Sequence, residues 1–388
     1  MKRYFKHLTQ ILTLLVVVAV SIQCTKKTDP TDDTINAVLV ANVKGLDPIQ
    51  TNDLYSHMVV RQIYEGLMGY HYLKRPLQLE PQLADGMPKV TKDGLTHTFK
   101  IKKGILFHDD PAFKDGKGRE LVAEDFIYSW RRLADPANRS TGFWIFDGKI
   151  KGLNEWAKAV GEGNADYSTP IEGLQATDSH TLVIKLNEPY YQLHYVLAMG
   201  FASVVAKEVV EKYGKEFLNH PVGTGPFKFK NWVRNQKIEL EANPTFREET
   251  YPTEGEAGDE EKGYLADAGK KLPIAKKLVF TELTEDQPRW LNFMKGNFDF
   301  LNIPKDNFNS AMAGRDLTPD MQKKGIQIQF TKEPDITYIA FNNQHPILKN
   351  KKVRQAMSLA YDTKTSLDIF YNNLGLLAQG PIPPDIDG

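Results

Sequence analysis

Carboxylate and histidine side chains are the groups in this sequence that could bind a metal ion or transfer a proton. The densest cluster lies between residues 247 and 263, where seven of 17 residues are Asp or Glu. Their spacing is not that of a calcium-binding loop, so a solvated surface loop is the better interpretation. His57 lies one helical turn after Asp53, and a lone pair of this kind is far more often structural than metal-binding. We therefore predict no metal site and no cofactor.

Catalysis needs a constellation of groups, and the sequence lacks the common ones. It contains no Gly-x-Ser-x-Gly elbow, no His-Glu-x-x-His, no phosphate-binding Walker loop and no Gly-x-Gly-x-x-Gly. Glu124 and Asp125 are adjacent on a predicted helix and point in different directions. Trp130, Trp144 and Trp156 could form a sugar-stacking platform, but core packing is the default for such aromatic residues. We predict no catalytic residue and a protein that is not an enzyme.

The N-terminus has the pattern of an export signal. The first 23 residues hold three basic and no acidic residues, and Ile11–Ile22 is nearly all apolar but short for a membrane span. Cys24, the only cysteine, follows at once. This resembles a lipoprotein-type signal peptide over 1–24 with lipidation at Cys24, and an uncleaved anchor helix is the alternative. Either arrangement predicts an extracytoplasmic protein held at a membrane, with a flexible tether over 25–34.

The rest of the chain alternates strands and helices. Its formal net charge is −3, because the whole chain is neutral and the leader carries +3, so nothing favours nucleic-acid binding. Asn52 or Asp53 can cap a helix with an apolar face from Tyr55 to Leu67. Further segments are predicted as strands over 37–43, 95–101, 182–186, 276–282 and 336–341, and as helices over 124–134, 287–295 and 352–361. Phe227 and Phe229 should form a hairpin with Ile238 and Leu240. The pattern is mixed α/β, with two or more domains.

Several motifs, in their order along the chain, resemble those of the extracytoplasmic peptide-binding proteins of ABC importers (solute-binding protein family 5, oligopeptide/dipeptide type). The most specific is the stretch from Ala123 to Pro136, AEDFIYSWRRLADP. The other motifs are Leu46-Asp47-Pro48, Tyr64-Glu65-Gly66-Leu67, Pro221–Pro226 with Asn231-Trp232, Asn243-Pro244, Phe341-Asn342-Asn343, Val353–Ala356 and Tyr361-Asp362. Each motif alone is weak evidence, but together and in this order they extend over nearly the whole chain after the leader.

The resemblance implies a two-lobed periplasmic-binding-protein-like (type II) α/β fold with an extra inserted domain. The first lobe would comprise residues 35–65 and 204–334, the inserted domain 66–203, and an incomplete second lobe 335–388. The two lobes of such proteins close over the ligand. Family members are usually longer, so the chain is expected to be C-terminally truncated, to expose apolar surface and to bind peptide weakly by itself.

The resemblance also implies ligand-binding residues. A general peptide binder pairs with the backbone of its ligand and leaves roomy, hydrated side-chain pockets. The loop that provides such contacts falls on Asn52, Asp53 and Leu54, although helix capping explains the first two equally well. Asn302 and Tyr338 are the other candidates, and Tyr338 could equally be a packed strand aromatic. The carboxylate that pairs with the peptide amino terminus is expected beyond the present chain.

The implied function is capture of oligopeptides outside the cytoplasmic membrane by a monomer and their delivery to the permease subunits of an ABC importer. One alternative keeps the fold and changes the ligand to a nickel complex, a sugar or another small solute. A second is a surface adhesin or receptor that reuses the fold. A hydrolase would need a nucleophile–base pair that the sequence does not offer.

Overall fold

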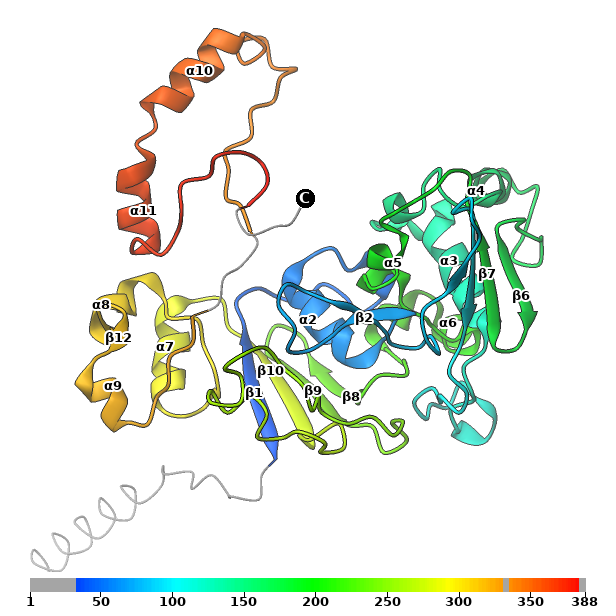
Figure 1. The fold of residues 1–388 in the computed structure, drawn as a ribbon, viewed down its shortest axis with the longest axis horizontal. Coiled ribbons are helices and arrows are strands. Elements are labelled where there is room, and N and C mark those ends of the chain that lie inside the picture. The colour runs from blue at the N-terminus through cyan, green and yellow to red at the C-terminus, as the bar shows by residue number, and fades with distance from the viewer. Residues whose placement is uncertain (1–32, 331–334, 384–388) are drawn as a thin grey trace, which may run out of the picture. The chain divides into compact units, whose positions relative to one another are not determined.

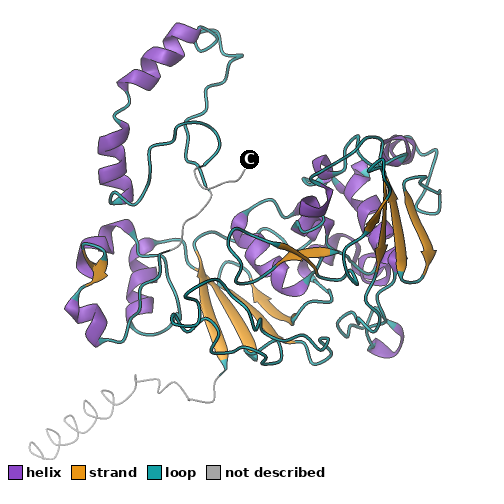
Figure 2. Cartoon of the chain, in the orientation of Figure 1, coloured by secondary structure: helices purple, strands orange, loops and turns teal. Residues whose placement is uncertain are grey.

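The structure, a computed structural model, describes residues 33–330 and 335–383 (Figure 1). Helices and strands alternate along the chain (Figure 2), as the sequence predicts. The chain divides into two compact units, one ending at Leu283 and one beginning at Thr284. The predicted signal peptide, with Cys24, lies outside the described residues. The predicted lobe boundaries, including the one near residue 335, stay predictions.

A four-stranded sheet holds the N-terminal strand of the first unit. Its order is β1 (Thr34–Leu39), β10 (Lys277–Glu282), β9 (Lys237–Ala242) and β8 (Phe227–Val233). β1 runs parallel to β10, and the other pairs are antiparallel. Alternation explains the burial in β9, because Ile238 and Leu240 enter the core while Glu239 and Glu241, which alternate with them, form ion pairs with lysines.

The predicted hairpin between β8 and β9 is confirmed, with one change in its register. Phe229 lies opposite Leu240, as expected, but Trp232 lies opposite Ile238. The ladder is irregular between Phe229 and Asn231, where a bulge adds one residue to β8. Period-two reasoning alone does not anticipate such an insertion.

A second four-stranded sheet, antiparallel throughout, lies within residues 89–185. Its order is β4 (Lys89–Val90), β5 (Thr96–Lys100), β7 (Thr181–Lys185) and β6 (Leu174–Asp178). Helix α3 (Ala123–Ala134) packs against β6 and β7, and α4 (Leu153–Gly161) packs against α3 (Figure 1). Trp130 and Trp156 are buried and donate to backbone carbonyls, whereas Trp144 is 58% exposed. The three tryptophans therefore form no common stacking platform.

The remaining elements of the first unit connect these sheets. They are helices α2 (Leu54–Ile63), α5 (Leu193–Val196) and α6 (Lys207–Tyr213), the hairpin β2 (Met68–Tyr70) and β3 (Leu79–Pro81), and 3-10 turns η1 to η6 at Pro48–Gln50, Lys114–Gly116, Pro136–Asn138, Phe143–Ile145, Gly200–Ala202 and Gly214–Asn219. One hydrophobic core runs through both sheets and α2, α3, α4 and α6. Burial of this apolar surface stabilises the first unit.

The second unit is mostly helical. A small core, centred on Trp290 and Met321, joins α7 (Asp286–Met294), η7 (Lys305–Asn307), α8 (Phe308–Ala311), the hairpin β11 (Met312–Ala313) and β12 (Asp316–Leu317), and α9 (Pro319–Lys323). Helices α10 (Lys351–Ala360) and α11 (Thr363–Tyr371) bury none of their residues. Leu359, for example, is 88% exposed.

The predicted strand over 336–341 is wrong. The structure has no strand there, and Tyr338 and Ile339 are 74% and 63% exposed. An apolar, β-branched run becomes a strand only when a neighbour satisfies its backbone groups, and no described strand pairs with it. Tyr338 is therefore not a packed strand aromatic. Over residues 33–330 and 335–383, no helix has both the length and the apolarity needed to span a membrane.

Candidate ligand-binding loop

The loop from Asp47 to Leu54 connects the first strand region to α2, and Asp47 organises its start. The Asp47 carboxylate accepts from the backbone N–H of Ile49 at 3.3 Å and caps η1. The Asp47 carbonyl accepts from the Thr51 hydroxyl at 2.8 Å. Pro48 follows directly, and its fixed φ suits the first position of a helical turn. The tight turn thus rests on one aspartate that uses both its side chain and its backbone.

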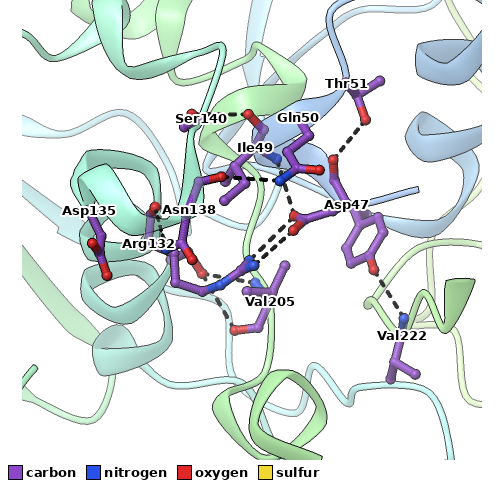
Figure 3. Close-up of polar contacts among 12 residues, drawn as sticks. Asp47, Ile49, Gln50, Thr51, Arg132, Asp135, Asn138, Ser140, Val205 and Val222 are labelled. Carbon is purple, nitrogen blue, oxygen red and sulfur yellow. Dashed lines mark hydrogen bonds and ion pairs between the residues drawn. The ribbon is translucent and has the colours of Figure 1, made fainter. Parts of the chain in front are cut away.

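Arg132 of α3 binds the carboxylate of Asp47 with its guanidinium group (Figure 3). Its two terminal nitrogens donate to the two carboxylate oxygens at 2.8 and 3.4 Å, and both side chains are less than 10% exposed. Burial alone would lower the pKa of Arg132, but the Asp47 carboxylate outweighs burial and leaves that pKa raised. Arg132 also lies over the ring of Phe217, 5.0 Å from its centre. A buried, bidentate pair of this kind neutralises the Asp47 carboxylate and also fixes the orientation of its side chain.

The segment after α3 holds the middle of the loop. The Ile49 carbonyl accepts from the Ser140 hydroxyl at 3.0 Å and from the backbone N–H of Thr141 at 3.1 Å. The Gln50 side-chain amide donates to the Asn138 carbonyl at 3.1 Å (Figure 3). Residues 132–141 therefore contact three of the first four residues of the loop. The motif that ends in Asp135-Pro136 was predicted as a helix and its stop, but nothing in its residues indicated that it faces this loop.

Asp53 ends the loop by capping α2. Its carboxylate accepts from the Ser56 backbone N–H at 2.9 Å and from the Ser56 hydroxyl at 2.7 Å. The capping role predicted for this position therefore belongs to Asp53. Asn52 does not cap the helix, and its side chain points into solvent, as does that of Leu54, which is 65% exposed.

The loop ends in three consecutive backbone N–H groups, those of Asn52, Asp53 and Leu54. Within the part of the chain that the structure describes, the N–H groups of Asn52, Asp53 and Leu54 have no hydrogen-bond partner. Such groups are the donors that an extended peptide can pair with. The buried Asp47–Arg132 pair fixes the start of the loop, and the partly buried contacts of Asp53 with Ser56 fix its end, so these donors are held in one conformation.

The other two candidates belong to the second unit. Asn302 exposes its side chain in the segment before Ile303-Pro304, and Tyr338 is largely exposed in a stretch without secondary structure. Asn52, Asp53 and Leu54 are consecutive and lie in the first unit. Asn302 and Tyr338 lie in the second unit and remain candidates.

A second buried carboxylate joins two of the sequence motifs and the start of the acidic segment. Glu65, next to Gly66-Leu67, accepts from both terminal nitrogens of Arg247 at 2.8 and 2.9 Å. It also accepts from the Thr224 hydroxyl of the Pro221–Pro226 turn at 2.8 Å and from the Gln82 amide at 3.2 Å. Arg247 is the first residue of the acidic segment and Glu65 lies 182 residues before it, so this pairing was not predictable from the sequence.

The same turn is held by a neutral histidine. His108 donates from Nε2 to the Gly225 carbonyl at 2.9 Å, and its Nδ1 faces the Gly223 backbone N–H at 3.4 Å. Burial lowers the pKa of His108 to about 4. A Cβ at Gly223 would lie 2.0 Å from the Ile63 carbonyl oxygen, so only glycine fits where the turn passes the end of α2.

The acidic segment is a surface loop, as predicted. Glu254, Glu256, Glu260 and Glu261 are exposed, and only Asp259 is buried, where it accepts from the Glu256 backbone N–H at 2.8 Å. Among the described residues, no three His, Cys, Asp or Glu side chains gather as metal ligands would. A separate open cleft of about 1820 Å³ lies within the first unit and is not lined by the Asp47–Leu54 loop.

Comparison with known proteins identifies the class. The sequence profile of the bacterial extracellular solute-binding proteins, family 5 Middle, matches residues 78–388, and the chain belongs to this family. Haem-binding protein A of Haemophilus influenzae is 27% identical over 84% of this chain and 52% of its own length. The probable di/tripeptide-binding protein 5 of Pseudomonas aeruginosa is 25% identical over 91% of this chain and 59% of its own length. The chain thus spans little more than half of these relatives.

The fold comparison agrees. The periplasmic binding protein DppA from Helicobacter pylori, solved with the peptide STSA, matches with a TM-score of 0.66 and 23% identity, over 91% of this chain and 61% of that chain. The α/β fold of type II periplasmic binding proteins, expected from the sequence, is confirmed. Since the family consists of solute-binding proteins, the prediction that the chain is not an enzyme is also confirmed.

Proposed function

We propose that this chain belongs to an extracytoplasmic lipoprotein that captures oligopeptides and delivers them to the permease subunits of an ABC importer. The observation that carries the proposal is the set of backbone N–H groups of Asn52, Asp53 and Leu54, which have no partner among the described residues. The buried ion pair between Asp47 and Arg132 fixes the loop that carries them. The relatives named for di/tripeptide binding and for a bound peptide support it. Asn302 and Tyr338 are proposed as further contacts from the second unit, Cys24 as the lipidated anchor and the monomer as the working form.

A proline substitution tests the backbone contact. Leu54 is the first residue of α2, where proline is tolerated because its N–H has no partner within the helix. Asp53 has φ −118° and ψ 152°, which is the extended conformation that a following proline requires. Leu54→Pro should therefore keep the fold and lose one donor to the ligand. We expect about tenfold weaker peptide binding, the loss for one good hydrogen bond.

Leu54→Ala is the matched control, because it removes the same side chain and keeps the N–H. Binding is measured by calorimetry on the protein purified from its native host, against a pool of short peptides, with mass analysis of its length and of Cys24. Equal affinities for the two variants would refute backbone recognition at this end of the loop. An unmodified Cys24 would refute the lipid anchor.

A second candidate keeps the fold and takes another solute, and the haem-binding relative favours it. The same preparation, titrated with haem, separates the two. Saturable binding of haem in the absence of any peptide binding would replace the first proposal.

A further inference from the structure

We infer that Arg132 is a positioning residue, which fixes the Asp47–Leu54 loop so that its free backbone donors face the ligand. Only the claim that these donors meet a ligand rests on the proposed function. The physical claim, that one buried guanidinium sets the order of this loop, stands on the contacts within the first unit.

The contacts converge on the loop from one direction. Arg132 binds Asp47, and its carbonyl accepts from the Asn138 side-chain amide at 3.0 Å. Asn138 in turn accepts from Gln50 through its carbonyl, and Ser140 donates to Ile49. The guanidinium of Arg132 therefore holds the loop through Asp47, while its backbone carbonyl, which a substitution leaves in place, binds the segment that contacts the middle of the loop (Figure 3).

Asp47 transmits the effect because it has two roles. The carboxylate oxygen that caps Ile49 is also one of the two that accept from Arg132. Without the guanidinium, a carboxylate with 8% exposure would be left buried without a counterion, and rotation into water would relieve it. That rotation would release the η1 cap and, with it, the fixed start of the loop that carries Asn52–Leu54.

Arg131 provides a control in the adjacent position. Its side chain is 9% exposed, and it donates to the carbonyls of Tyr167 and Thr169, away from the loop. Arg131 and Arg132 thus share a residue type, a helix and near-complete burial, but only Arg132 contacts residues 47–54. A general loss of stability should affect both variants, whereas a loss of loop order should follow Arg132 alone.

Hydrogen exchange followed by mass spectrometry on the whole chain tests this. In Arg132→Met, we expect amide exchange at Ile49, Gln50 and Thr51, whose N–H groups are hydrogen-bonded within the loop, to be at least about tenfold faster than in the wild type, through local opening. In Arg131→Met, faster exchange should be confined to residues 166–170. Arg132→Lys, which keeps the charge and loses the two-pronged guanidinium, should show a smaller rise at residues 49–51 and serves if the methionine variant fails to fold.

Unchanged exchange at residues 49–51 in the Arg132 variants, or an equal rise there in Arg131→Met, would overturn the inference. Peptide affinity then tests the claim that these donors meet a ligand: it should fall about tenfold in Arg132→Met and stay unchanged in Arg131→Met. Faster exchange with wild-type affinity would overturn that claim. Faster exchange in a protein that binds no peptide, wild type included, would support the positioning role while the proposed function fails.

Discussion

The ion pair between Glu65 and Arg247 makes the sharpest stability prediction. Glu65 has a side chain that is 1% exposed, and it accepts four hydrogen bonds, two of them from Arg247, which is 10% exposed. Glu65→Gln keeps the shape but removes the charge and replaces one acceptor oxygen by a donor. Donors would then face donors, and Arg247 would keep only Glu249 as a counterion.

We expect this substitution to lower the free energy of unfolding of the first unit by about 3–5 kcal/mol, the cost of breaking a buried pair from one side. With a urea dependence of about 2–3 kcal/mol/M, the midpoint should fall by roughly 1–2.5 M. Hydrogen exchange of β9 amides during urea titration reports on the first unit separately from the second.

Glu249→Gln is the matched control, since Glu249 binds the same guanidinium but is 41% exposed. Its cost should stay below about 1 kcal/mol. If Glu65→Gln and Glu249→Gln proved equally mild, burial would not be what makes the Glu65 pair important, and the reasoning would fail.

Three further predictions concern the turn and the core. Burial lowers the pKa of His108 to about 4 in the folded state, from about 6.5 in the unfolded chain. The neutral side chain therefore contributes its full stability above about pH 6.5, and about 3 kcal/mol of the free energy of unfolding is lost as the pH falls from about 6.5 to 4. His108→Gln should flatten that part of the measured profile of stability against pH. Gly223→Ala should cost more than about 3 kcal/mol in urea unfolding, because its Cβ meets a backbone carbonyl at 2.0 Å, while Gly45→Ala, with nothing nearer than 3.5 Å, should cost less than about 1 kcal/mol. Trp130→Phe should lower the thermal midpoint through a lost hydrogen bond and a cavity worth about 2–3 kcal/mol, whereas Trp144→Phe, at an exposed position, should leave that midpoint unchanged.

Local patterns were sufficient for most elements. The helix predicted over 124–134 is α3, and the strand predicted over 276–282 is β10, because amphipathic periodicity and a stop such as Asp135-Pro136 act within one segment. The strand over 336–341 failed because a strand depends on a partner that periodicity does not reveal. The bulge in β8 escaped the sequence for a similar reason, since it is defined against β9.

The sequence by itself determined the mixed α/β fold class and a helix start at the Asn52–Leu54 corner with Asn52 or Asp53 as its cap, since caps and turns arise from neighbouring residues; the structure decided for Asp53. Only the tertiary structure decided what holds that corner. Arg132 reaches Asp47 across 85 residues, and Arg247 reaches Glu65 across 182. A buried charge needs its partner within hydrogen-bond distance, and which distant residue arrives there is set by how the helices and sheets pack.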